Sequence, residues 1–151
     1  MSEPSLRDRV QADLTAAMKA RDATRVGALR MLITALVNRE KELRRPLTDD
    51  EVREVAAREV KRRTESIEAF EAGGRADLVA KETAEREILA AYAPEQLSEA
   101  ELDRIIEEAI AEVGATGPGD LGKVMGKVMG AARGRVDGAV VQRKVRARLG
   151  A

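Results

Sequence analysis

Apolar residues recur three and four positions apart through almost the whole chain, and this spacing limits the possible folds more than any other feature. No segment alternates apolar and polar residues over the length of a typical strand. Residues that cap or break helices separate the periodic segments. The sequence therefore predicts an all-α protein. The expected helices cover Ser5–Arg21, Thr24–Arg44, Thr48 to Gly73, Arg75–Tyr92 and Ser98 to Gly114, with a glycine-rich helix from about Asp120 and a last helix capped by Asp137.

One interruption suggests a domain boundary. The segment Tyr92-Ala93-Pro94-Glu95-Gln96-Leu97 breaks the helical spacing, and Ser98 and Glu101 behind it form a capping box. We expect an amino-terminal helical bundle over residues 1–94 and a three-helix tail over residues 95–151.

The composition limits the catalytic and metal-binding chemistry that the chain can perform. The 151 residues include no cysteine and no histidine, which removes the commonest general base, metal ligand and strong nucleophile. We expect no catalytic residue, no metal site and no cofactor. No apolar run approaches the roughly 20 residues that span a bilayer, and the amino terminus lacks a signal-peptide pattern. The expected location is the cytoplasm, away from membranes, and the oligomeric state stays open.

The charges balance overall but not locally. Residues 98–119 carry one basic and six acidic side chains, whereas residues 120–151 carry eight basic and two acidic ones. A local excess of one sign can attract an anionic partner even when the whole molecule is neutral.

Glycines recur every four residues in the tail. On a helix Gly122, Gly126 and Gly130 share one face, which Lys123 and Lys127 flank. Each glycine inside a helix costs about 1 kcal/mol relative to alanine, so the repeat requires a compensating contact with a partner helix or a phosphate backbone. We expect part of this spacing to serve packing.

The loop behind this repeat is a candidate phosphate site. Arg133 and Arg135 lie beside the start of the last helix, whose free amides favour anions, although Asp137 as a cap competes for those amides. The predicted RNA-binding residues are Lys123, Lys127, Arg133, Arg135, Gly126, Gly130, Gly134 and Lys144.

Two other basic segments are expected to form ion pairs on the protein surface. Arginines and lysines within 39–45 and 58–63 are interleaved with glutamates, which favours surface pairs of opposite charge four residues apart. We expect these segments to be scaffold.

Aromatic residues restrict the kind of RNA. Phe70 and Tyr92 are the only ones, so the chain has no platform on which unpaired bases could stack. Recognition through phosphates and shape fits a folded RNA such as tRNA.

Several segments together resemble the YqeY-like proteins. These segments are Ala17–Asp22, Leu29–Leu32, Arg58–Arg63, Tyr92–Leu97 and Gly122 through Gly138. That family is similar to the carboxyl-terminal region of GatB, a component of the aspartyl/glutamyl-tRNA amidotransferase. The resemblance implies an all-helical, two-part fold and a role in holding tRNA. The resemblance also implies a carbon–nitrogen ligase activity that uses glutamine as the amide donor. We ascribe this activity to the larger protein, the amidotransferase. Ala93 replaces a common leucine, and Ala131-Ala132 stand where a more basic stretch is usual.

Taken together, these features predict a non-catalytic, tRNA-binding accessory protein, with a possible protein partner in tRNA amidation or translation. The alternative is a helical protein-interaction module that docks a partner through its glycine face.

Overall fold

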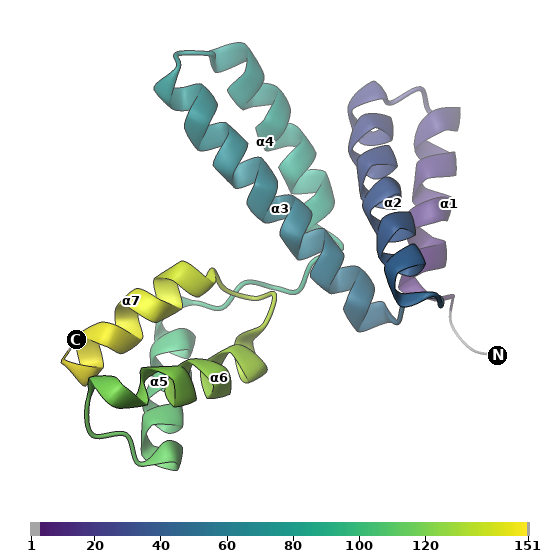
Figure 1. Ribbon diagram of the computed structural model, residues 1–151. Coiled ribbons are helices and arrows are strands. Elements are labelled where there is room, and N and C mark those ends of the chain that lie inside the picture. The colour runs from purple at the N-terminus through teal and green to yellow at the C-terminus, as the bar shows by residue number, and fades with distance from the viewer. Residues whose placement is uncertain (1–3, 151) are drawn as a thin grey trace. The chain divides into compact units, whose positions relative to one another are not determined.

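The computed structural model describes residues 4–150, and in this part of the chain it is all-α, as the sequence predicts, with no strand (Figure 1). The described residues form two compact units, one ending at Pro94 and the other beginning at Glu95. The amino-terminal unit contains α1 (Leu6–Lys19), α2 (Ala23–Leu43), α3 (Asp49–Ala72) and α4 (Ala76–Ala90). The tail unit contains α5 (Glu99–Val113), the short 3-10 helix η1 (Pro118–Asp120), α6 (Leu121–Ala132) and α7 (Gly138–Leu149).

Side chains at the helix starts fix most of the boundaries. The Thr48 hydroxyl accepts a hydrogen bond from the Glu51 amide, and the Glu51 carboxylate accepts one from the Thr48 amide, so the predicted capping box is present. The Arg45 guanidinium also donates to Glu51 at 2.7 and 2.8 Å. This hydrogen bonding, from Arg45 first, lowers the pKa of Glu51 to about 2. Ser98 caps α5 through the Glu101 amide.

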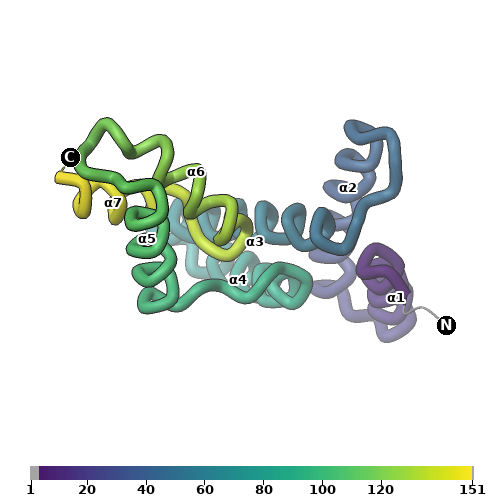
Figure 2. The backbone as a smooth tube through the Cα atoms, turned by 90° about the horizontal axis from the view of Figure 1, so that it is seen from below, coloured from purple at the N-terminus to yellow at the C-terminus, as the bar shows by residue number. Residues whose placement is uncertain are grey.

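The amino-terminal unit is built from two helical hairpins, α1 with α2 and α3 with α4, which can be followed in Figure 1 and from below in Figure 2. Helix α2 packs on α3 and α4 as well as on α1. Its residues Leu29, Leu32 and Leu36 are completely buried and share one core with Val52 of α3 and Leu89 of α4. The apolar stripe of α2 thus joins the two hairpins.

Charged residues are also buried between α3 and α4. The Arg63 guanidinium lies 3.3 Å from a carboxylate oxygen of Glu82 and 3.3 Å from one of Glu85, and 4.0 Å from Glu59. Glu59, Arg63 and Glu85 are each less than one-tenth exposed. The expectation of surface pairs in this segment is therefore wrong for Glu59 and Arg63. Helix α4 covers this face of α3, and opposite charges compensate one another there.

The tail unit has a separate apolar core. Ile106 of α5, Val124 and Val128 of α6, and Val141 and Val145 of α7 are completely buried. The amide of Leu97 donates to the carbonyl of Arg135 at 2.9 Å, which ties the beginning of this unit to the loop between α6 and α7.

Because the two units have separate cores, a cavity made in one core should destabilise only that unit. Ile106→Ala removes a completely buried side chain from the tail core and should lower the unfolding free energy of that unit by about 2–5 kcal/mol. Tyr92 belongs to the other core, and its hydroxyl donates to Asp13 at 2.5 Å, so tyrosine fluorescence reports on the amino-terminal unit. In urea titrations, circular dichroism should show an earlier partial transition while the fluorescence midpoint stays in place. Equal shifts with both probes would show that the units unfold together.

Candidate nucleic-acid interface

The glycine face of α6 is open. Gly122, Gly126 and Gly130 are exposed, and a Cβ atom added at any of them would meet no atom within 4 Å. The opposite face carries Val124 and Val128, which fill the core. The expectation that part of the glycine spacing serves packing is therefore wrong within the described chain. The valines occupy the packing positions, and the glycines leave a flat outer surface.

The loop between α6 and α7 uses one of its two arginines for structure. Arg135 Nε donates to the Glu95 carbonyl at 3.0 Å, and an Nη atom of Arg135 lies 4.0 Å from Glu101. Gly134 has a φ of 77°, a conformation that favours glycine, and its carbonyl accepts from the Gln96 side chain at 3.3 Å. Arg133 is exposed and forms no ion pair or side-chain hydrogen bond within residues 4–150.

The start of α7 is capped. The Asp137 carboxylate accepts a hydrogen bond from the Ala139 amide at 2.9 Å, as the sequence predicts for an N-cap. A carboxylate thus occupies the position that an anion would take at this helix end. The structure therefore does not support a phosphate site on the amides of α7.

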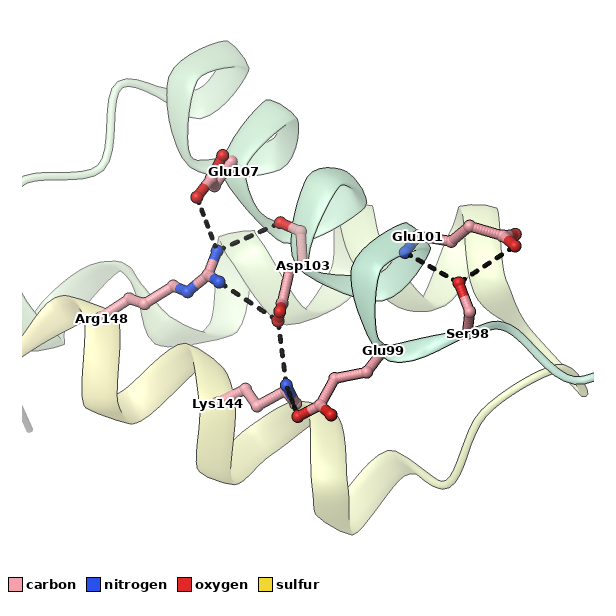
Figure 3. A network of polar contacts seen from close by, with 7 residues as sticks. All are labelled: Ser98, Glu99, Glu101, Asp103, Glu107, Lys144 and Arg148. Carbon is pink, nitrogen blue, oxygen red and sulfur yellow. Dashed lines mark hydrogen bonds and ion pairs between the residues drawn. The ribbon is translucent and has the colours of Figure 1, made fainter.

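The inner face of α7 pairs with the acidic residues of α5 (Figure 3). Lys144 Nζ lies 2.9 Å from Asp103 and 3.0 Å from Glu99. Arg148 contacts the Asp103 carboxylate at 3.2 Å, its carbonyl oxygen at 3.1 Å and Glu107 at 3.5 Å. The hydrogen bond from Lys144 is the largest cause of the lowered pKa of Asp103, and the same bond raises the pKa of Lys144. Lys144, a predicted RNA-binding residue, therefore has its charge compensated inside the unit.

The remaining predicted cations lie on α6. Lys127 forms an ion pair with Glu112 at 2.9 Å, and both side chains are more than half exposed. Lys123 is exposed and has no ion pair in the described chain. It lies near Asp120, whose pKa is lowered mainly by hydrogen bonds from the Thr116 and Gly117 amides, with a smaller contribution from Lys123.

Two arginines missing from the predicted set lie on the outer face of α7. Arg143 and Arg146 are exposed, line a shallow groove of about 410 Å³ together with Gln142, and form no ion pair among residues 4–150. The sequence contained a signal for them. Val141, Val145 and Leu149 mark the buried face of α7, so positions 143 and 146 point away from it.

The structure therefore divides the eight predicted residues. Lys123, Arg133, Gly126 and Gly130 lie open on α6 and at its end, Lys127 shares its charge with Glu112, and Arg135, Gly134 and Lys144 contribute to the fold. The cations of α6, α7 and their connecting loop that form no ion pair within residues 4–150 are Lys123, Arg133, Arg143 and Arg146.

Two further properties of the described residues concern clusters of metal ligands and helices that could span a membrane. Residues 4–150 contain no cluster of three or more carboxylates arranged to hold a metal ion. Within the same residues, no helix combines the length and the apolar character that crossing a bilayer requires.

The pairing of Lys144 with Asp103 predicts that the stability of the fold depends on pH. A carboxyl group whose pKa is lowered by folding stabilises the fold above its ordinary pKa of 3.8, and this contribution disappears as the pH falls through the lowered value. Lys144→Met should therefore lower the unfolding free energy at neutral pH, and the deficit should shrink below about pH 4. Urea titrations across this range measure it. Arg143→Met, on the outer face of α7, should show no such trend, and a deficit independent of pH would contradict the assigned pairing.

Comparisons with known proteins give matches that extend over both units. Residues 7–149 match the family model of the Yqey-like proteins. The chain is 32% identical over 148 residues to "Altered inheritance of mitochondria protein 41, mitochondrial" of Pyrenophora tritici-repentis, covering 95% of this chain and 80% of that protein. It is 37% identical over 81 residues to the protein of the same name from Eremothecium gossypii, covering 53% of this chain and 44% of that protein. The chain belongs to the YqeY family.

Proposed function

We propose that this protein is a non-catalytic accessory protein that holds a folded RNA, of the tRNA class, through its tail unit. The observation that carries the proposal is a set of cations that form no ion pair in the described chain, Lys123, Arg133, Arg143 and Arg146, on exposed parts of α6, α7 and the loop between them. Cations without an ion-pair partner attract a phosphate backbone more strongly than paired ones do.

The glycine face supports this proposal. Gly122, Gly126 and Gly130 carry no side chain that would hold a backbone away from α6, and Lys123 lies beside them. A ribose–phosphate backbone can approach such a surface closely. The lack of a structural role for the glycines inside the unit favours a role in contact with a partner.

The aromatic residues indicate recognition by shape. Tyr92 is buried and Phe70 is partly buried, and both belong to the amino-terminal unit. Neither offers a free ring to an unpaired base, so contacts would go to phosphates and sugars. The similarity of the family to a tRNA-holding region of an amidotransferase favours tRNA. Under this proposal the ligase chemistry belongs to the larger protein, and the predicted cytoplasmic location stays a prediction.

The first test is the salt dependence of tRNA binding. About four neutralised phosphates should give a slope of log affinity against log salt of about −3 to −4. Replacing Arg143 and Arg146 by alanine should reduce the magnitude of this slope by about 1 for each lost contact. Fluorescence anisotropy with labelled bulk tRNA over a salt series measures both quantities.

The matched control is Lys19→Ala with Lys81→Ala, which removes two exposed charges from the amino-terminal unit. This variant should retain the slope of the unmodified chain. Absence of binding at low salt, or equal slopes for the Arg143/Arg146 variant and the unmodified chain, would contradict the interface.

The second test separates stability from binding. Gly126→Ala adds a methyl group into open space on a helix and should raise the unfolding free energy by about 0.5–1 kcal/mol. The same methyl group should weaken tRNA binding if the backbone approaches this face. Gly27→Ala in α2 is the matched control, since its added Cβ also meets no atom within 4 Å. It should stabilise the chain without changing tRNA affinity.

The open glycine face also favours a second candidate function, docking of a partner helix on α6. Small residues at four-residue spacing allow two helices to approach closely. In that case Gly126→Ala would abolish co-purification of a protein partner and leave tRNA affinity unchanged. This result would replace RNA binding as the role of the glycine face.

A further inference from the structure

The amino-terminal unit contains a groove that the proposed RNA interface does not use. It lies between α2 and α3, has a volume of about 410 Å³ and is lined by Arg30 and Arg39 of α2 and by Arg58 and Arg62 of α3. These arginines belong to segments that are far apart in the sequence. Packing of α2 against α3 brings them to one site.

Two of these four arginines are compensated and two are not. Arg39 pairs with Glu42 at 2.8 Å, and Arg62 lies 3.6 Å from Glu59. Arg58 is exposed and has no ion pair or side-chain hydrogen bond in the described chain. The Arg30 guanidinium makes a 3.7 Å contact with the sulfur of Met18, with no carboxylate partner among residues 4–150. The groove therefore offers two free guanidinium groups, one from each helix.

The groove also exposes apolar surface. Met31 lines it and is 48% exposed, and Met18, beside Arg30, is 42% exposed. These two are the exposed large apolar side chains of the described residues. Ala35 and Val55 add apolar lining. Exposed methionines adapt to the shape of a partner and are common at surfaces that bind helices.

A buried charge holds this surface in place. Arg63 is 5% exposed on its side chain and donates a hydrogen bond to the sulfur of Met31 at 3.0 Å. Arg63 is itself fixed by Glu82 and Glu85 of α4. Met31 thus has a defined position although nearly half of its surface is open.

The length of the groove suits a helix. Its residues on α2 run from Arg30 to Glu42 at successive turns, which corresponds to about 18 Å, or a little over three helical turns. An amphipathic helix of about 12 residues could lie along it, with apolar side chains on Met31, Ala35 and Val55. Carboxylates on the flanks of that helix would reach the free guanidinium groups, which bind carboxylates in a bidentate manner.

We propose that the α2–α3 groove binds an acidic, amphipathic helical segment of a partner protein. An RNA fits this groove less well. Met31, Ala35 and Val55 belong to the lining, and these apolar side chains would contribute little to binding a phosphate backbone but can pack against the apolar face of a helix. This site is independent of the proposed tRNA interface in the tail unit.

The test begins with an unbiased selection. A phage library of random 14-residue peptides is selected on the immobilised full-length chain, and enriched peptides are synthesised with a fluorescent label. We expect peptides with several carboxylates and apolar residues at i, i+3 or i+4, and i+7. Their dissociation constants are then measured by anisotropy against variants of the full chain.

Arg30→Glu and Arg58→Glu should each weaken binding at least about tenfold, since each replaces an attractive charge by a repulsive one. Lys81→Glu is the matched control, because it makes the same charge change at an exposed position of α4. It should change the affinity less than about twofold. Met31→Gln keeps the side-chain length and an acceptor for Arg63 but removes apolar surface, and should weaken binding severalfold.

Several results would overturn the proposal. One is the enrichment of no peptide, and another is the enrichment of peptides that bind the Arg30 and Arg58 variants as tightly as the unmodified chain. A third is a loss of tRNA affinity in these variants without any selected peptide, which would assign the groove to nucleic acid. If a glutamate variant fails to fold by circular dichroism, Arg30→Gln and Arg58→Gln provide the same comparison. Alanine at Arg143 and Arg146 should leave peptide affinity unchanged, which separates this test from that of the RNA interface.

Discussion

The pairing of the carboxylates of α5 with the inner cations of α7 determines which charges of the tail unit are neutralised within the fold. Lys144 and Arg148 both meet Asp103, and their partners Glu99 and Glu107 lie on the same helix. Exposed ion pairs add little stability one by one, so their main effect here is on the orientation of α7. Opposite charges are neutralised between the two helices, and Arg143 and Arg146, which have no ion pair in the described chain, lie on the outer face of α7. The proposed interface is a consequence of this separation.

The glycine repeat of α6 lowers the stability of this helix and leaves its outer surface open. Val124 and Val128 supply the buried contacts, and Met125 and Met129 pack at their edge. Nothing in the unit gains from the absence of side chains at Gly122, Gly126 and Gly130. Glycine in the interior of a helix costs about 1 kcal/mol relative to alanine, and the 12 residues of α6 include three exposed glycines. Such a cost is understandable when function requires a flat helix face.

Buried ion pairs in the amino-terminal unit fix the positions of helices and side chains. Arg63 links α3 to α4 through Glu82 and Glu85, and it also holds Met31 of α2. Glu59 pairs with Arg63 on the inside and with Arg62 at the groove. One compensated cluster thus supports the packing of three helices and the geometry of the α2–α3 groove. The buried charges specify position as well as contributing energy.

The sequence by itself determined the helices and most of their starts, because caps and apolar spacing act over a few residues. Ser98, Thr48 and Asp137 form the hydrogen bonds expected from their local sequence. The sequence also located the excess of positive charge in residues 120–151. The apolar spacing of α7 indicates its outer face, but only the tertiary structure decided which cations are paired with carboxylates. Lys144 and Arg143 are neighbours in the sequence, yet one faces the carboxylates of α5 and the other faces outward. Likewise, Glu59 and Arg63 look like a surface pair until α4 covers them. Local hydrogen bonds are encoded within one helical turn, whereas burial and charge compensation depend on which helix packs against which face.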